Sequence, residues 1–456
     1  MFSPLLYQIS RTMRTQFLYI FLLITISVHS QPAFAPLSTG VLSSKEVKCV
    51  YGDTVSGLLY AGGNFTVAGG LPANRIASWN GTNWDSLSSG AGPAGAVYDI
   101  DRYNGSIIAG GSFSQIGGVQ ASGLAAWDGT SWSPLVQLKT RYNSTCSVFS
   151  ILVENGQLYI AGSFDSINGM PANSVARFDG SNWFSYPMIE NDLSIIGEPT
   201  FYNGELYVIG NIWDPNQGVK HIVRYDGTSW LPVGNGFSLG AYTNALEVYN
   251  NELYIGGFFS PPNDPGYNLV KWNGTNYIQL NMTPTFQVHE LKVIGNKLYV
   301  GGTFWAVGNI PNTAHCARLN GSTWESIGGV FDNGVLAIDD LNGDIFIGGG
   351  FWTVDGDTMN AITRYVGAVG MAEYNSATSL LIYYGDGNAY VMIPDGLTGP
   401  CTLTVFDVNG CLINEHNSNG DTRVPINFSD RPTGVYFVRY RNEEGFEGSG
   451  AFVKYE

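Results

Sequence analysis

The chain has 456 residues, of which 44% are hydrophobic and 13% are charged, so it can form two or three domains with sizeable cores. Its 59 glycines, 11 tryptophans and 26 tyrosines are typical of many short strands joined by tight turns. The formal net charge of −16, with only 21 Lys and Arg, argues against nucleic acid or an anionic membrane surface as a partner.

The N-terminal segment has the pattern of a secretory signal. Two arginines precede the apolar run Phe17–Ile26, which is too short to span a membrane as a helix. Small residues predict cleavage before Gln31, with cleavage after Ala35 as the alternative, and the start can be Met1 or Met13. We therefore expect residues 1–30 to be a signal peptide.

Residues 34 to 368 are copies of one repeat. A strand that ends in glycine is followed by a hydrophobic residue, as in Leu158–Phe164, and then by two short strands around an Asp-Gly or Asn-Gly turn, as in Val175–Trp183. Such a dipeptide favours a hairpin because a type I′ turn needs positive φ at both central residues. The period of about 48 residues is in the range of propeller blades. Seven copies align on Phe65, Phe113, Phe164, Ile212, Phe259, Phe304 and Phe351.

Each copy supplies four strands, A to D, but the seventh lacks strand D. Residues 34–40 resemble strand D of the first copy, residues 84–90. The predicted fold of residues 31–368 is therefore all-β, a seven-bladed β-propeller closed by an N-terminal strand, which leaves no unpaired blade edge. Tight A–B and C–D turns lie on one face of such a disc. The longer B–C and D–A loops lie on the other face, where we expect ligands to bind.

Residues that recur at fixed positions of the repeat are expected to serve the fold. The aromatic residues of strands C and D are predicted to pack between blades. Cys49, Cys146 and Cys316 are interpreted as small buried residues, while the disulfide state of the five cysteines stays open. The basic residue before the strand C aromatic is interpreted as an ion or hydrogen-bond partner between blades; these residues are Arg177, Arg224, Lys271, Arg318 and Arg364.

Residues that depart from the repeat in the B–C and D–A loops are the candidates for ligand binding. Trp213, Trp305 and Trp352 are the most interesting, because aromatic side chains beside carboxylates form platforms for sugar rings or peptides. The alternative is that a Trp at the end of strand B only covers the blade edge. The candidate residues are Arg75, Arg141, Tyr142, Trp213, Asp214, Lys220, His221, Trp305, Trp352, Asp355 and Asp357.

The sequence predicts no catalytic residue, no metal site and no cofactor. The histidines are scattered singly, without the i, i+2 or i, i+4 spacing that begins a metal site. Asp355-Gly356-Asp357 resembles only a fragment of a calcium loop. The Asp-Gly turns lack the spacing of the sialidase Ser-x-Asp-x-Gly-x-x-Trp turn.

A different pattern begins near residue 369. Strands around residues 380–393, 403–408, 434–440 and 451–454 alternate with turn residues. Several short strands within about 85 residues favour a small Ig-like β-sandwich over residues 369–456.

Both parts of the chain resemble known families. The repeat resembles kelch-like propellers, whose blades carry a Gly-Gly pair after a strand and two spaced aromatic residues later. The C-terminal segment resembles the sorting domain of the type IX (Por) secretion system in residues 404–410, 432–439 and 452–454. The motif residues that carry this resemblance are Asp407, Gly410, Gly434, Val435, Tyr436 and Lys454. It implies export by the type IX machinery and a place outside the cell or on the outer-membrane surface.

We therefore expect a secreted, monomeric binding or adhesion protein whose ligand is an extracellular glycan or protein. One alternative is a glycan-processing enzyme whose two carboxylates come from different blades. Another is a scaffold without a small ligand. Acidic residues clustered around the central channel would favour the enzyme, an aromatic loop face would favour the binding protein, and a uniformly polar face would favour the scaffold.

Overall fold

The chain consists of two compact units in the computed structural model. The larger unit is Ala33–Ala372, and the smaller contains Glu373–Glu456. All regular elements in the described part of the chain are β-strands. The described residues are 34–42, 46–92, 95–140, 146–187, 196–214, 218–237, 241–259, 267–365, 381–385, 388–392, 400–407, 412–419, 423–442 and 447–454.

Seven four-stranded antiparallel sheets form the larger unit, and in six of them the strands follow in chain order. The first three sheets are β3 (Val47–Asp53), β4 (Leu58–Gly63), β7 (Ile76–Trp79) and β8 (Trp84–Asp85); β9 (Val97–Tyr103), β10 (Ser106–Gly111), β13 (Leu124–Trp127) and β14 (Trp132–Pro134); and β16 (Ser147–Glu154), β17 (Gln157–Ser163), β20 (Val175–Phe178) and β21 (Trp183–Ser185).

The next three sheets repeat this order. They are β22 (Ile196–Tyr202), β23 (Glu205–Asp214), β24 (Gly218–Tyr225) and β25 (Trp230–Pro232); β26 (Tyr242–Tyr249), β27 (Glu252–Phe258), β28 (Leu269–Trp272) and β29 (Tyr277–Gln279); and β30 (Val288–Ile294), β31 (Lys297–Gly302), β32 (Cys316–Asn320) and β33 (Thr323–Glu325).

The seventh sheet combines the two ends of the larger unit. It contains β34 (Val335–Leu341), β35 (Asp344–Gly349) and β38 (Ile362–Tyr365), and β1 (Phe34–Pro36) pairs with β38 in the register Phe34 to Tyr365. The Thr363 hydroxyl donates a hydrogen bond to the Ala35 carbonyl over 3.0 Å. The N-terminal strand therefore completes the sheet that the seventh repeat leaves one strand short.

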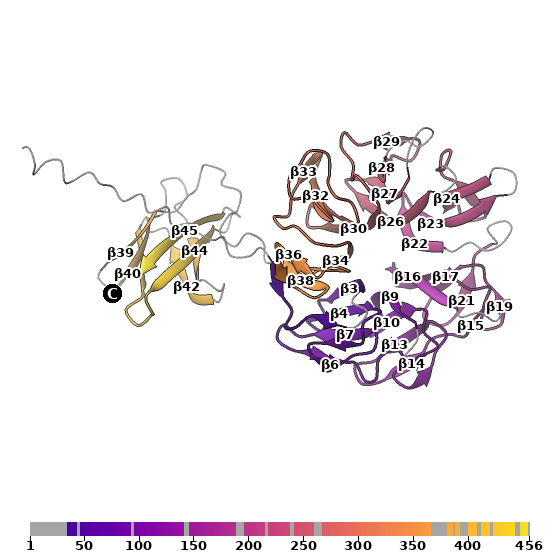
Figure 1. The fold of residues 1–456 in the computed structure, drawn as a ribbon, viewed down its shortest axis with the longest axis horizontal. Helices are drawn as coiled ribbons and strands as arrows, with labels where there is room; N and C mark the ends of the chain where they lie inside the picture. Colours follow the sequence, from indigo (N-terminus) through magenta and orange to yellow (C-terminus); the bar gives the residue numbers. More distant parts are fainter. Residues whose placement is uncertain are drawn as a thin grey trace, which may run out of the picture. The chain divides into compact units, whose positions relative to one another are not determined.

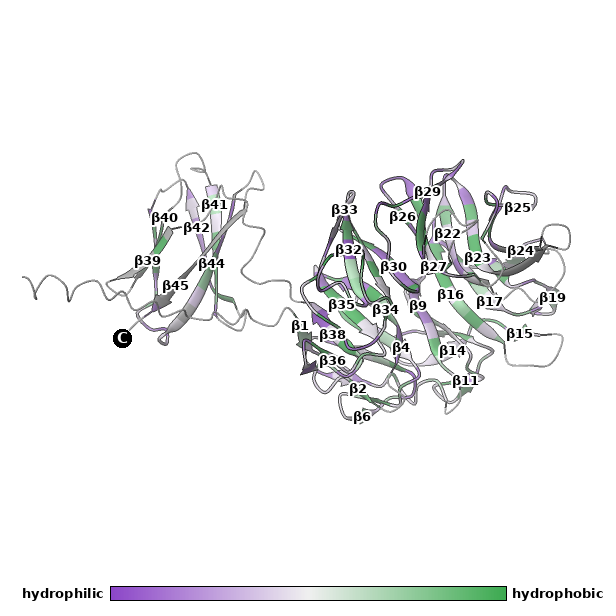
Figure 2. Cartoon of the chain, turned by 45° about the horizontal axis from the view of Figure 1, so that its top comes forward, coloured by the Kyte–Doolittle hydropathy of each residue, from purple (hydrophilic) through white to green (hydrophobic). Residues whose placement is uncertain are grey.

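The first strands of the sheets lie side by side around a common centre (Figure 1). Each contacts the next in the order β3, β9, β16, β22, β26, β30 and β34, and β34 contacts β3. The hydrophobic clusters contain residues from adjacent sheets; one joins Leu59 and Ala61 of β4 to Phe346 of β35. The inner strands are correspondingly hydrophobic in Figure 2. The core thus lies between neighbouring sheets rather than within any one of them.

Aromatic residues of the last strands link neighbouring sheets, as the sequence predicts. The indole Nε1 of Trp84 donates to the Leu37 carbonyl over 2.9 Å, and that of Trp132 donates to the Leu87 carbonyl over 3.0 Å. Each acceptor lies 42 to 47 residues earlier in the chain, which is one repeat. The same link is made by Trp230, Tyr277 and Trp324.

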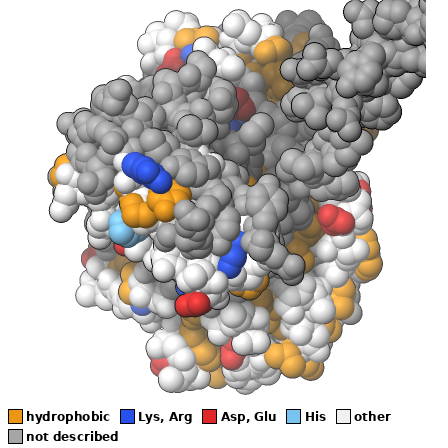
Figure 3. All heavy atoms as spheres, turned by 90° about the vertical axis from the view of Figure 1, so that its left-hand side faces the viewer, with side chains coloured by type: hydrophobic (Ala, Val, Ile, Leu, Met, Phe, Trp, Pro, Cys, Tyr) orange, Lys and Arg blue, Asp and Glu red, His pale blue; other side chains and the backbone are white. Residues whose placement is uncertain are grey.

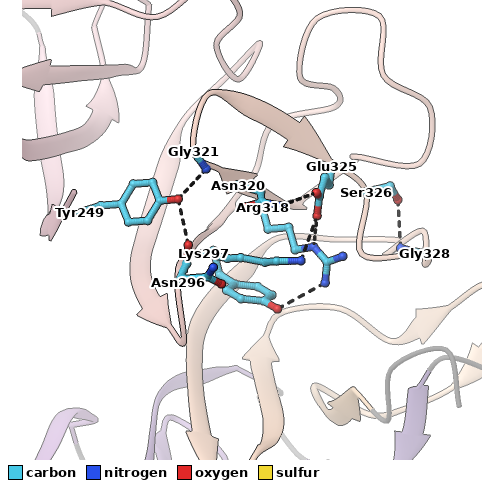
Figure 4. Close-up of polar contacts among 10 residues, drawn as sticks. Tyr249, Asn296, Lys297, Arg318, Asn320, Gly321, Glu325, Ser326 and Gly328 are labelled. Carbon is cyan, nitrogen blue, oxygen red and sulfur yellow. Dashed lines mark hydrogen bonds and ion pairs between the residues drawn. The ribbon is translucent and has the colours of Figure 1, made fainter. Parts of the chain in front are cut away.

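The recurring basic residues pair within a sheet, so the prediction of partners in neighbouring blades is wrong. Arg318 donates to Glu325 of the same sheet over 2.7 Å, as Figure 4 shows. The reason is geometric, because a cross-strand or diagonal neighbour is within reach of a long side chain. The other contacts within a sheet are Arg224 with Glu205, Lys271 with Glu252, Arg364 with Asp344, and Arg177 over the Phe184 ring.

Links between sheets come instead from tyrosine hydroxyls and backbone groups. The Tyr249 hydroxyl of β26 donates to the Asn296 carbonyl and accepts from the Gly321 N–H, both in the next sheet (Figure 4). Both distances, 3.0 and 2.7 Å, are those of ordinary hydrogen bonds. One phenol thus ties two turns of the following sheet to β26.

Several segments expected to be loops form small hairpins. The turn of β36 (Thr353–Val354) and β37 (Asp357–Thr358) has positive φ at Asp355 and Gly356, 53° and 89°. The two-residue strands are too short for a periodicity to be visible in the sequence. The other members of this class are β2 (Val41–Leu42), β5 (Val67–Ala68), β6 (Leu71–Pro72), β11 (Gln115–Ile116), β12 (Val119–Gln120), β15 (Leu138–Lys139), β18 (Ser166–Ile167) and β19 (Met170–Pro171).

The smaller unit contains two antiparallel sheets with one shared core. Leu403, Val405, Val424 and Ile426 are among the buried residues of this core, which joins strands of both sheets. One sheet is β39 (Leu381–Gly385), β40 (Asn388–Met392) and β43 (Arg423–Asn427), and the other is β42 (Leu412–Asn419), β41 (Pro400–Phe406), β44 (Gly434–Asn442) and β45 (Glu447–Lys454).

Lys454 fastens the last strand to a turn. Its ammonium group donates to the carbonyls of Phe428, Ser429 and Arg431, the first over 2.8 Å. Replacing Lys454 with Met keeps the aliphatic stem but removes these bonds. We expect a destabilisation of about 1.5–3 kcal/mol, typical of hydrogen bonds to a charged group.

Hydrogen exchange of β45 should measure this effect, with faster exchange of its amides in Lys454→Met. Glu415→Gln on β42 is the control, because Glu415 is exposed and should leave exchange unchanged. Unchanged exchange in Lys454→Met would contradict the role of the ammonium group.

Candidate functional site

A cavity of about 700 Å³ lies where the first strands of the seven sheets meet. Its walls are formed by β3, β9, β16, β22, β26, β30 and β34, together with Gly210 of β23 and His221 of β24. Side chains two residues apart on a strand point to the same side. Every first strand therefore contributes residues at two levels of the cavity wall.

Acidic residues occupy both levels. The first level contains Asp99 of β9, Glu198 of β22 and Glu290 of β30. Two residues further along the strands, the second level contains the carboxylates of Asp101, Glu247 and Asp339, and the ammonium group of Lys292. No sequence motif pointed to these residues, because they are spread over five copies of the repeat.

Most of these carboxylates accept backbone hydrogen bonds from the next sheet. Asp99 accepts from the Ile151 N–H over 2.7 Å, and Glu198 accepts from the Leu246 N–H over 2.8 Å. The same bridge is made by Asp101 to Val153, by Glu247 to Val293, and by Asp339 to Gly52. These carboxylates therefore tie the first strands together.

Glu290 differs from the other acidic residues. In the described part of the chain its carboxyl group makes no hydrogen bond and no ion pair, although it lines the cavity. Asp339 has two partners, since it also binds Lys292 over 2.8 Å. Glu290 is thus a half-buried acid of the cavity wall, and the Lys292 ammonium on the same strand acts on it electrostatically.

Burial and mutual repulsion keep protons on these acids. Burial raises the pKa of Asp99 to about 7, that of Asp101 to about 6 and that of Glu198 to about 8. Burial, followed by the charge of Glu198, raises the pKa of Glu290 well above its usual range. At neutral pH the cavity therefore holds a mixture of carboxyl and carboxylate groups.

Basic groups in the cavity are few. Burial alone would lower the pKa of Lys292, but the Asp339 carboxylate raises it above its ordinary range. Burial and the charge of Lys48 lower the pKa of His289 to about 4, so this imidazole is neutral at pH 7. Lys48 itself pairs with Glu46 over 2.9 Å.

A second feature is a row of exposed aromatic side chains, here called the aromatic platform: Tyr242, Phe258, Phe286 and Trp305. Trp305 is 71% exposed and Tyr242 is 54% exposed. The Trp305 and Phe286 rings are stacked, with centroids 5.7 Å apart and an angle of 12°, and Phe258 meets Phe286 edge-on at 5.1 Å. Because Tyr242 pairs with Phe258 and also lines the cavity, the platform begins at the cavity wall.

Trp352, Asp355 and Asp357 lie on the β36–β37 hairpin or directly before it. Trp352 is 40% exposed, and its backbone N–H donates to the Asp332 carboxylate over 2.7 Å. Asp355 accepts from the Val330 N–H over 2.9 Å, so this carboxylate holds the turn in place. Among the described residues no group of three His, Cys, Asp or Glu is arranged to hold a metal ion.

The other predicted residues are dispersed. The Arg75 guanidinium donates to the Asn64 carbonyl and so stabilises its own connection. His221 is buried at the cavity wall. The backbones of Trp213, Asp214 and Lys220 belong to β23 and β24, while their side chains lie outside the described part, as do Arg141 and Tyr142.

Most of the motif residues of the smaller unit lie in β44 and β45 or beside β41. Tyr436 is buried, donates to the Pro432 carbonyl over 2.9 Å and meets Phe428 edge-on. Gly434 pairs with Lys454, and Val435 pairs with Val453, which brings the two ends of the motif together. Asp407 follows β41, and Gly410 lies outside the described residues.

The described cysteines are buried. Cys49, Cys146 and Cys316 are each less than 8% exposed, as expected for small buried residues, and Cys401 is buried in the smaller unit. Cys411 lies outside the described residues. No helix in the described ranges has the length and hydrophobicity that crossing a membrane would need.

Charged side chains do not gather on the face that Figure 3 shows. On this face the coloured Lys, Arg, Asp and Glu side chains form separate spots. The described residues on this face therefore form no basic patch of the kind that binds nucleic acid.

Comparison with known proteins finds similarity in both units. Residues 388–453 match the secretion system C-terminal sorting domain, and residues 154–181 match a β-propeller domain of unknown function, DUF5122. A DUF3244 family protein from Bacteroides vulgatus, with an immunoglobulin-like β-sandwich fold, is 12% identical over 18% of this chain and 88% of its own, with a TM-score of 0.16. A search of curated proteins finds no match.

The sorting domain determines where the protein is found. Such domains mark proteins that are secreted by the type IX system, so this chain interacts with that machinery and is located outside the cell or at its surface. The larger unit is similar to a β-propeller domain over residues 154–181, which contain β17 to β20.

Proposed function

We propose that this chain is a secreted, monomeric binding protein that recognises an extracellular glycan. In this proposal residues 31–368 are a seven-bladed, kelch-like β-propeller closed by the N-terminal strand, and residues 369–456 are an Ig-like sorting domain that follows it. A leader of residues 1–30 would direct the chain to the first membrane. The aromatic platform is the binding surface.

The observation that carries the proposal is the exposure of four aromatic rings at one place. Large apolar side chains in contact with one another are rarely left in water unless they bind something. The stacked Phe286 and Trp305 rings present flat faces, which suit the apolar face of a sugar ring. Tyr242 adds a hydroxyl group, which can bind a sugar hydroxyl.

The second candidate is a glycan-processing enzyme, and the acidic cavity favours it. Its chemistry would need one protonated and one ionised carboxyl group across the sugar bond. Asp99 and Glu198, however, each use an oxygen to hold the next sheet. This occupation of the carboxylates supports binding over catalysis.

The test is a glycan-array screen of the mature chain recovered from the culture medium. Replacing Trp305 with Ala removes the most exposed ring and should weaken binding at least about tenfold, the effect of about 1.4 kcal/mol. Trp352→Ala is the matched control, since Trp352 occupies the equivalent position of the next sheet but is outside the platform.

Loss only in Trp352→Ala would move the site to the β36–β37 hairpin, and equal losses in both variants would contradict the assignment of the site to the platform alone. Absence of binding to every glycan would refute the proposal in favour of a protein partner.

A further inference from the structure

The aromatic platform continues into the opening of the central cavity. Tyr242 belongs to both features, because it pairs with Phe258 of the platform and also lines the cavity. It lies where β26 begins, directly before Thr243, which pairs with Gly257 of β27. The first strands of other sheets have a valine in the position of Thr243, again opposite a glycine of the second strand; these are Val97, Val148 and Val288.

The residues that directly follow these positions are here called the cavity mouth: Tyr98, Phe149, Asn244 and His289, with Lys48 and Leu336 of the remaining sheets. All six side chains are half-buried and line the cavity. The Tyr98 and Phe149 rings are in contact, with centroids 5.5 Å apart. By register the mouth lies at the same end of the first strands as Tyr242, so the platform and the mouth can contact one ligand.

The platform and the mouth have almost no net charge. The segments that carry the platform contain no Asp, Glu, Lys or Arg; they are residues 241–246, 253–259, 281–288 and 303–314. At the mouth the Lys48 ammonium pairs with Glu46 over 2.9 Å. The His289 imidazole is neutral at pH 7, because burial and the charge of Lys48 lower its pKa to about 4. The site therefore suits a ligand without charge.

The polar groups of the mouth suit hydroxyl groups. The Asn244 amide nitrogen donates to the Val288 carbonyl over 2.8 Å, and this bond does not use the amide oxygen, which is an acceptor. The Tyr98 hydroxyl accepts from the Ser112 hydroxyl over 3.3 Å and is itself a donor. A neutral sugar offers both donors and acceptors to such groups.

An acidic sugar would be disfavoured at the same place. The next residues along the strands include Asp99 and Glu198, and the lining lysines, Lys48 and Lys292, already have carboxylate partners. A uronate at the mouth would bring another negative charge beside acidic groups, with no cation of the lining left to neutralise it. The cavity therefore selects against anionic glycans.

The ring of first strands decides which part of a glycan can enter. Each first strand contacts the next, and β34 contacts β3, so the cavity is walled on every side. A linear chain cannot enter such an opening sideways, but its end can. The terminal sugar would then lie at the mouth and the following sugars would lie along the platform.

We propose that the platform and the cavity mouth form one site for the end of a neutral glycan chain, with the terminal sugar against Tyr98 and Phe149 and the following sugars on Trp305 and Phe286. The cavity volume of about 700 Å³ is in the range of small-molecule sites. This inference rests on the proposed glycan binding and adds the class of glycan and the part of it that is bound.

The first test is an array of hexasaccharides in which each neutral member stands beside the uronate of the same sugar and linkage. We expect the mature chain to bind neutral members at least about tenfold more tightly than their uronates. Uronates bound as tightly as their neutral counterparts, with binding lost in Trp305→Ala, would overturn this inference and leave the platform as the glycan site. Binding to no member would refute the proposed function, and this inference with it.

The second test examines the mouth with the hexasaccharide that binds most tightly. Phe149→Ala should lower the affinity at least about tenfold. Phe184→Ala is the matched control, because it makes the same change at an exposed ring on β21, the last strand of the same sheet. Equal affinities of the two variants would overturn the role of the mouth. Circular dichroism checks the fold of Phe149→Ala, and Tyr98→Ala replaces it if it does not fold.

The third test locates the contact along the glycan. Isothermal titration calorimetry with a long polysaccharide of the same sugar and linkage gives the number of protein molecules bound to each polysaccharide chain. Binding of a chain end gives at most one protein molecule per end. Many protein molecules along each polysaccharide chain would overturn the binding of chain ends.

Discussion

Replacing Phe34 with Ala should lower the free energy of unfolding of the larger unit by about 3–5 kcal/mol, the range for a buried Phe. Phe34 is 1% exposed, and its ring meets those of Phe331 and Tyr365 with centroids 5.3 Å away in each case. The substitution would leave a cavity between β1, β38 and the loop before β34, which contains Phe331. It would also weaken the pairing that joins the two ends of the unit.

Urea denaturation of the purified chain measures this effect. Phe286→Ala is the control, because it makes the same change at an exposed ring and should cost less than about 1 kcal/mol. Equal losses in the two variants would mean that β1 adds nothing to the stability of the unit.

Stability should also fall as the pH rises from about 4 to about 8. The pKa values of Asp99, Asp101 and Glu198 are raised to about 7, 6 and 8 in the folded chain, so the folded state holds protons that the unfolded state has released. This contribution is complete below pH 4 and is lost above the folded pKa values. One pKa unit corresponds to about 1.4 kcal/mol, so we expect a total loss of at least about 3 kcal/mol.

Thermal unfolding between pH 4.5 and 8.5 tests this dependence. Glu198→Gln removes one titrating group while its amide oxygen still accepts from the Leu246 N–H, so the decline should become shallower. Asp357→Asn should leave the slope unchanged, because this exposed carboxylate lies on the β36–β37 hairpin and does not line the cavity. A midpoint that rises from pH 5 to pH 8 would be incompatible with the raised pKa values.

The sequence is informative wherever a feature recurs. The recurring features are the Asn-Gly and Asp-Gly turns, the aromatic residues of the last strands and the pattern of strand D. Because residues 34–40 have the strand D pattern that the seventh copy lacks, the pairing of Phe34 with Tyr365 could be expected. The type IX sorting domain was likewise recognisable from short motifs in β44 and β45.

The central cavity could not be predicted, because its residues do not recur. The position held by Asp99 and Glu198 is occupied by Cys49, Ser150 and Ala245 in other sheets, so an alignment of the copies makes the acids look like random variation. Only the ring of first strands brings them together. The platform was found in part: Trp305 was a candidate, whereas Phe286 lies in a different loop and joins it only in three dimensions.

The pairing of β1 with β38 imposes an order on folding. Ala35 and Thr363 are 328 positions apart, so β1 is synthesised long before β38, the strand with which it pairs. Until then the seventh sheet is incomplete and one edge stays unpaired. Contacts between such distant segments form slowly, because loop closure must precede them. This delay favours export, because a chain that finishes folding late is still unfolded when it is translocated across a membrane.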